Sequence, residues 1–215
     1  MLLDKITDSK IETNWEKFKE LLLSTGRENI EELITYLETK TDFKYAPAST
    51  KYHGAFKGGL CEHSLAVYEI IMRLNAIYEE LYGEAFDKSS LIIVSLLHDI
   101  SKTNVYEETV INKKIYSNEG SKFDELGKFD WVSVKSYKVK DLKDRFVFVN
   151  HETTSEFIIR QFLDLSIAES ISIMTHHNGM GSDSIPYEAT GPNLSKYPLS
   201  LLLHEADLMA AYTWA

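Results

Sequence analysis

Apolar residues recur at helical spacing in the first fifty residues. Trp15, Phe18 and Leu22 mark a first amphipathic helix, and the segment TNWE at residues 13–16 has the Thr-x-x-Glu form of a capping box. A second helix is predicted from about residue 28 to 38, with its apolar stripe at Ile30, Leu33, Ile34 and Leu37. We assign residues 1–50 to an N-terminal helical appendage that precedes the main domain.

Helical periodicity returns after a stretch that contains Pro47 and several glycines. It spans residues 60–82, ends at Gly83, and resumes in a helix that Asp87 caps and that runs to about His98. Further helices are predicted at residues 151–163, at 166–177, where SIAE forms another capping box, and at 199–211 after Pro198. Residues 178–197 are rich in Gly, Ser and Pro, and we expect a loop there.

Residues 103–149 have a different character. The segments VYEETVINKKIYS, FDWVSVKSYKV and RFVFV are rich in β-branched and aromatic residues and partly alternate with polar ones. They predict a short antiparallel sheet or ribbon. The expected architecture is an all-α helical bundle with a small antiparallel β insertion, in a main domain of residues 51–215.

The net charge and the cysteine content limit which binding partners and which compartment we expect. The chain has 215 residues and a net charge of −10, whereas long nucleic acid is normally bound by a basic surface, so we do not expect that partner. A small anionic ligand remains compatible if local positive charge or a metal overrides the global field. A single cysteine, Cys61, excludes an internal disulfide. With no secretion signal or membrane span expected, we predict a cytoplasmic protein.

Histidine and aspartate residues gather at the predicted helix ends. Because helices packed as a bundle can aim such side chains at one point, a shared site is expected. Imidazole nitrogen and carboxylate oxygen suit Mn, Fe, Co, Ni or Zn. The candidates are too many for one tetrahedral ion, so two divalent ions are predicted, with Asp99 able to bridge them. The candidate ligands are His63, His98, Asp99, His151, His176, His177 and Asp207.

Five ordered motifs within residues 52–213 carry a resemblance: HGAFKGGLCEHSLAVYEI, LLHDISK, NHE, THHNG and LLLHEADLMAA. Together they resemble the HD-domain metal-dependent phosphohydrolases of the order His, His-Asp, His, His-His, Asp. The resemblance implies His63, His98, Asp99 and Asp207 at one ion and His151 with the 176–177 pair at the second. It also implies that Lys102 contacts substrate phosphate. The chain departs from the family at Ser101, where glycine is usual, and in its longer β insertion.

The substrate side of the site is less defined. His53 either lines the pocket or is a loop histidine without a role. Residues 128–145 carry six basic and three acidic residues together with Trp131 and Tyr137, which is compatible with a rim that stacks bases and steers phosphates. An ordinary charged ribbon face is the alternative.

These expectations combine into a metal-dependent phosphohydrolase that cleaves a phosphoester of a small nucleotide with an activated water. Asp99 and Lys102 are the expected catalytic residues. A 3′–5′ exoribonuclease is one alternative, and a non-catalytic, metal-containing nucleotide-binding protein is another. The sequence leaves self-association and the identity of the ions open.

Overall fold

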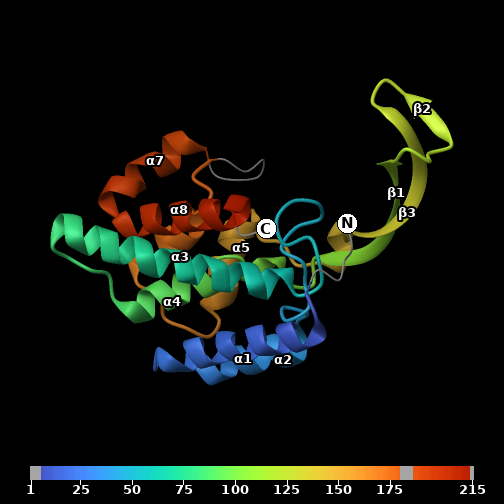
Figure 1. Cartoon of the computed structure of the whole chain (residues 1–215). Helices are drawn as coiled ribbons and strands as arrows, with labels where there is room; N and C mark the ends of the chain where they lie inside the picture. The colour runs from blue at the N-terminus through green and yellow to red at the C-terminus, as the bar shows by residue number, and fades with distance from the viewer. Residues whose placement is uncertain (1–5, 180–185, 214–215) are drawn as a thin grey trace.

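The computed structural model describes residues 6–179 and 186–213, and its centre is a bundle of helices (Figure 1). The long α3 (Gly59–Tyr82) packs against α4 (Lys88–Leu97) and α8 (Pro198–Thr213). α5 (His151–Ile159) and α6 (Ile167–Met174) pack on each other, and α6 also packs on α8. The sequence-based expectation of a helical bundle with a small β insertion is confirmed.

The first two helices join the same hydrophobic core. α1 (Asp8–Ser24) packs against α3 and α4, and α2 (Ile30–Lys40) packs against α1. Phe18 and Leu22 are fully buried in one cluster with residues of α3 and α4, since their spacing puts both on one face. A division of the chain at residue 50 therefore stays a prediction, although the helices before it share the core of the bundle.

The first helix begins earlier than the capping box at residue 13 suggests. Thr7 is the cap, and its hydroxyl accepts a hydrogen bond from the main-chain N–H of Lys10 at 3.2 Å. Thr13 lies inside the helix, where its hydroxyl donates to the carbonyl of Ser9 at 2.9 Å. The prediction of a cap at Thr13 is wrong because an upstream hydroxyl already satisfies the first free N–H groups.

An ion pair fastens the turn between α1 and α2 to α6. The guanidinium of Arg27 donates to the buried carboxylate of Glu169, to the hydroxyl of Ser89 and to the carbonyl of Asp164. Glu169 also completes the predicted capping box with Ser166 at the start of α6.

The β insertion forms a ribbon that projects from the bundle (Figure 1). β1 (Tyr106–Tyr116) pairs antiparallel with β3 (Gly127–Val139) from Tyr106 opposite Val139 to Tyr116 opposite Phe129. The short β2 (Lys122–Asp124) pairs with the start of β3. Many apolar side chains of the ribbon are exposed, including Phe123 at 78% and Trp131 at 51%.

The segment RFVFV is not a third long strand. After the ribbon, η2 (Leu142–Asp144) turns the chain back towards the bundle, and the rings of Phe146 and Phe148 pack against Phe157 of α5. This prediction is wrong because the apolar residues pack on a helix rather than beside a strand.

The segment between α6 and α8 is more helical than expected. α7 (Tyr187–Lys196) packs on α8 and occupies part of the predicted loop, while positions 180–185 lie outside the described residues. Pro198 is the first residue of α8, as predicted. Among the described helices, none combines the length and apolar character needed to span a bilayer.

Candidate metal centre

Two histidines follow helix ends and are held in the same way. α4 ends just before His98 and α6 ends just before His176, where helix carbonyls lack partners. His98 Nδ1 lies 2.9 Å from the carbonyl of Ser95, and His176 Nδ1 lies 2.7 Å from that of Ile173. Because a carbonyl only accepts, each Nδ1 carries a proton, and each Nε2 faces the pocket, where it can bind an ion once it carries no proton of its own.

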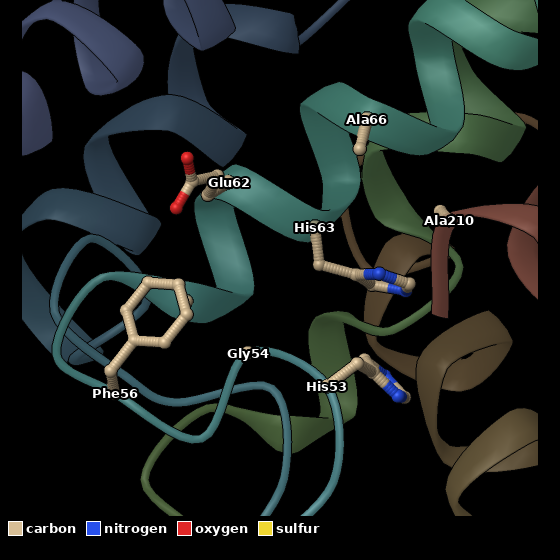
Figure 2. A pocket seen from close by; sticks show the side chains of 8 residues that line it. His53, Gly54, Phe56, Glu62, His63, Ala66 and Ala210 are labelled. Atoms are coloured by element: carbon tan, nitrogen blue, oxygen red, sulfur yellow. The ribbon is translucent and has the colours of Figure 1, made fainter. Parts of the chain in front are cut away.

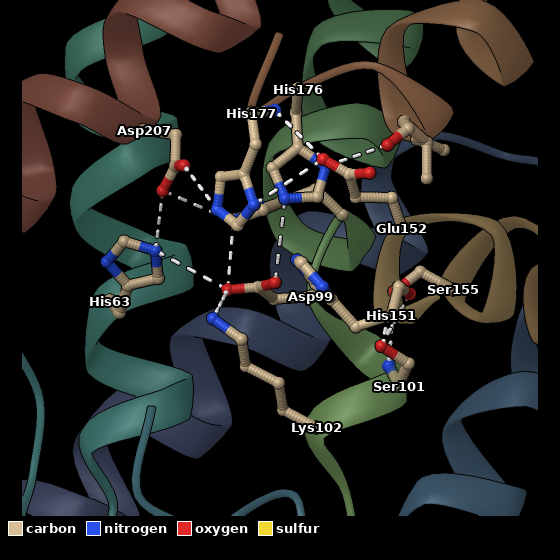
Figure 3. A network of polar contacts seen from close by, with 12 residues as sticks. His63, Asp99, Ser101, Lys102, His151, Glu152, Ser155, His176, His177 and Asp207 are labelled. Carbon is tan, nitrogen blue, oxygen red and sulfur yellow. Dashed lines mark hydrogen bonds and ion pairs between the residues drawn. The ribbon is translucent and has the colours of Figure 1, made fainter. Parts of the chain in front are cut away.

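Asp99 lies between the histidines that the separate helices supply (Figure 3). Its Oδ2 is 3.4 Å from His98 Nε2 and 3.8 Å from His63 Nε2, and its Oδ1 is 3.7 Å from His176 Nε2. Asp99 is thus placed where a carboxylate could bridge two cations.

Asp207 reaches the same pocket from α8 on the other side. Its Oδ1 is 2.9 Å from His63 Nε2 and 3.6 Å from His98 Nε2, and its Oδ2 is 3.6 Å from His177 Nε2. Behind it, His204 donates from Nδ1 to the carbonyl of His176 at 2.6 Å, so α8 also fixes the end of α6.

His151 opens α5 and faces the 176–177 pair. Its ring centroid is 5.6 Å from that of His176 and 4.7 Å from that of His177. Asn150 caps the helix by accepting from the N–H of Thr153. The hydroxyl of Ser101 donates to the carbonyl of His151 at 2.7 Å. The serine that departs from the family pattern therefore links the His98-Asp99 segment to α5.

Glu152 is a buried member of the site that the sequence analysis missed. Its side chain accepts from Asn150 Nδ2 at 2.9 Å and from the main-chain N–H of His177 at 3.3 Å, and Oε1 lies 3.4 Å from His177 Nδ1. It is only 1% exposed. An acidic residue directly after His151, on the first turn of a helix, is the signal that could have identified it.

A close approach of two glycines places His53 beside His63 (Figure 2). A Cβ on Gly59 would lie 2.1 Å from the carbonyl oxygen of Gly54. The loop that carries His53 and Gly54 can therefore approach the start of α3 this closely only because residue 59 has no side chain. The two imidazole centroids are 4.6 Å apart, and both rings point to the same side in Figure 2.

The donor set fits divalent cations. Ligand atoms about 2.1 Å from one ion lie roughly 3 to 4 Å from one another. The candidate ligands form three groups, and within each group the ligand atoms lie within 4.8 Å of one another. The groups are His63, His98 and Asp99; His98, His176 and Asp207; and His151, Glu152, His176 and His177. Buried Nε2 atoms of His98 and His176, and Oδ1 of Asp99, make no hydrogen bond. Such atoms are normally paired, so a bound ion would account for them.

The electrostatics favour anionic carboxylates at this site. Burial alone would raise the pKa of Asp99 and Asp207. Lys102 and the neighbouring imidazoles hold the pKa of Asp99 well below its usual range, and His63 and His98 do the same for Asp207. Burial lowers the pKa of His53 to about 4, and the charge of His63 adds to the shift. Against the effect of burial, Asp99 and Asp207 raise the pKa of His98 to about 10, which shows how strongly the pocket attracts positive charge.

A cleft of about 720 Å³ opens beside these residues. Lys102 and His53 line it, with His151 and His177, and Lys102 Nζ lies 2.6 Å from Asp99 Oδ2. The ribbon contributes its base, Tyr106 and Val139.

Trp131 and Tyr137 are not among the residues that line this cleft. Trp131 is eight positions beyond Val139 along β3, about 26 Å in an extended strand. Its ring contacts Phe129, and Lys114 lies over it. The structure brings the seven candidate ligands, Lys102 and His53 together, and it leaves Trp131 and Tyr137 on the ribbon, where a substrate role stays a prediction.

Comparison with known proteins agrees with this arrangement. The dihydroneopterin 2′,3′-cyclic phosphate phosphodiesterase of Methanocaldococcus jannaschii is 36% identical to the chain over 70 residues, which is 33% of this chain and 28% of the relative. The chain thus matches less than a third of that protein's length. No solved structure matches the chain. The family model for the HD domain matches residues 60–211, from the start of α3 to α8, and the chain belongs to the HD domain family.

Proposed function

We propose that this protein is a metal-dependent phosphohydrolase that cleaves a phosphoester in a small nucleotide-like molecule. The observation that carries the proposal is the buried set of imidazole and carboxylate ligand atoms, several without hydrogen bonds, at the wall of an open cleft. Divalent ions bound there would lower the pKa of water and polarise a phosphoryl oxygen.

The side chains around the ligands have the properties that this chemistry needs. Lys102 is a largely buried cation beside Asp99, and the attraction of that carboxylate raises the pKa of the lysine against the effect of burial, so it stays charged. Its charge would stabilise the negative charge that grows on the phosphoryl oxygens. With a pKa of about 4, His53 is neutral at pH 7 and can donate one ring N–H to a substrate oxygen.

A cyclic phosphodiester of a small nucleotide is the first substrate to test, since the relative from Methanocaldococcus jannaschii is named for one. The purified chain is loaded with Mn²⁺, Fe²⁺, Co²⁺, Ni²⁺ or Zn²⁺. It is then incubated with 2′,3′-cyclic and 3′,5′-cyclic nucleotides, nucleoside monophosphates and single-stranded RNA. Chromatography and phosphate release identify the bond that is cut. We expect ring opening of a cyclic phosphodiester to a phosphomonoester without free phosphate.

Asp99→Asn tests the link between turnover and the site, because it removes the charge of the central carboxylate at almost constant volume. We expect activity to fall by about 10³-fold or more, since the candidate ion sites would lose a charged ligand that could bridge two ions. Asp124→Asn is the matched control, because Asp124 also pairs with a lysine, Lys114, but on the ribbon. A folded, ion-loaded protein that binds nucleotide and cleaves no phosphoester refutes the proposal and supports a binding protein.

A further inference from the structure

The pocket beside the candidate ligands opens into two lobes. The first is the cleft of about 720 Å³, one wall of which contains Arg145, Phe146, Val147 and Val149. The second, of about 500 Å³, is lined by Leu208, Ala211 and Tyr212 of α8. Tyr52, His53 and His177 line both lobes. A phosphate at the ion-binding wall therefore has room for substituents on either side.

Arg145 lines the first lobe and does not line the second. Its Nε is buried and makes no hydrogen bond, and no carboxylate among the described residues forms an ion pair with it. Carboxylates are abundant, since the chain has 33 acidic residues against 23 lysines and arginines. A buried donor on a charged group is normally paired, so the Nε of Arg145 needs a partner that the described residues do not supply.

The wall that carries Arg145 is fixed to the helix that carries His151. The hydroxyl of Thr154 in α5 makes two hydrogen bonds to the main chain of Phe148. It accepts from the N–H at 2.9 Å and donates to the carbonyl at 2.8 Å. Val149 has a φ of 67°, a conformation that is costly for a β-branched residue and persists only where its surroundings impose it. The segment that follows Arg145 is therefore held in a defined place relative to the candidate ligands.

We propose that Arg145 binds a second anionic group of the substrate, a phosphate that is separate from the phosphoester to be cleaved. This inference rests on the proposed function. The phosphoester lies at the wall that the two lobes share, next to His177, and the second phosphate lies in the first lobe. The planar guanidinium can donate two parallel N–H groups to phosphate oxygens, which a lysine cannot do. The preferred substrate class is thus a nucleotide with an additional terminal phosphate.

The test uses two compounds that differ in one group: adenosine 2′,3′-cyclic phosphate and the same compound with a 5′-phosphate. Binding is measured by calorimetry to the Lys102→Gln variant with Mn²⁺, which keeps every candidate ion ligand and lacks the charge expected to support turnover. We expect the 5′-phosphate to increase affinity by roughly 10- to 100-fold, the range for a hydrogen-bonded charged group. Adding Arg145→Gln abolishes this difference and leaves the affinity for the compound without the 5′-phosphate unchanged.

Lys143→Gln is the matched control, because it removes the same charge two residues earlier, on the exposed η2, and Lys143 does not line the first lobe. It should retain the preference for the 5′-phosphate. Equal binding of the two compounds, no binding of either, or an equal loss in both variants overturns the inference. If the preference depends on Arg145 but the wild-type chain cleaves neither compound, the proposed function fails while the phosphate subsite stands.

Discussion

Replacing Glu152 by glutamine tests how the site holds His177. Glu152 lies against His177 Nδ1 and also accepts from its main-chain N–H. If the carboxylate takes the Nδ1 proton in a hydrogen bond, His177 presents Nε2 to an ion in a fixed orientation. Glu152→Gln keeps the volume and one acceptor oxygen but removes the charge. Such outer partners of a ligand typically contribute 10- to 100-fold in metal affinity, about 1.4 to 2.8 kcal/mol.

The assay is a competition for Mn²⁺ or Zn²⁺ against a fluorescent chelator, together with the number of ions bound per chain. We expect weaker binding at unchanged stoichiometry. Glu156→Gln is the matched control, because Glu156 lies one turn further along α5 and pairs with Arg160 outside the site. An unchanged affinity in Glu152→Gln contradicts the orienting role. Loss of one ion per chain in Glu152→Gln also contradicts the orienting role, because it would mean that Glu152 binds an ion directly.

Three further changes have expected outcomes. A transition-metal ion at 100 times its Kd should stabilise the chain by about 2.7 kcal/mol and raise Tm by roughly 5 to 11 °C in thermal melting, whereas no shift would contradict the metal centre. Glu169→Gln should cost about 2 to 4 kcal/mol in urea unfolding, because it leaves Arg27 without its buried partner. Burial alone would raise the pKa of Glu169, but hydrogen bonds from Ser166 and Arg27 hold this pKa below 4.5. The stability that the ion pair contributes is therefore present above pH 4.5 and is lost as the pH falls through the folded-state pKa. A stability difference between wild type and variant that does not change with pH would argue against the ion pair. Gly59→Ala should cost about 3 kcal/mol and weaken ion binding, because its Cβ meets the carbonyl of Gly54; a variant as stable as wild type would contradict the close approach.

The helices and the ligands could be predicted because both depend on local sequence. Helical period and helix ends are visible in single segments, and His98 and His176 are aimed by carbonyls only three residues away. Residues that act across distant segments were harder to find. Ser101 and Glu152 matter because η1 (Ile100–Lys102), α5 and the end of α6 meet in space, and no periodicity reports that meeting.

For the ribbon, the strands could be predicted from sequence but their position relative to the site could not. Alternating β-branched and aromatic residues predicted its strands, but the same composition suggested that Trp131 faces the substrate. The direction in which a hairpin leaves a domain depends on the few residues at its base. Here Lys140 fixes that base by donating from its main-chain N–H to the carbonyl of Val105 and from Nζ to that of Asn104. These contacts carry no pattern that a sequence reveals.

Because β1 and β3 hydrogen-bond mainly to each other, the ribbon can open while the bundle stays closed. In deuterium exchange, amides of residues 106–139 should lose protection well before those of α3 and α4, and added metal ions should slow exchange in the helices but not in the ribbon. The molecule would then consist of two cooperative units, and only one of them would report on the cations.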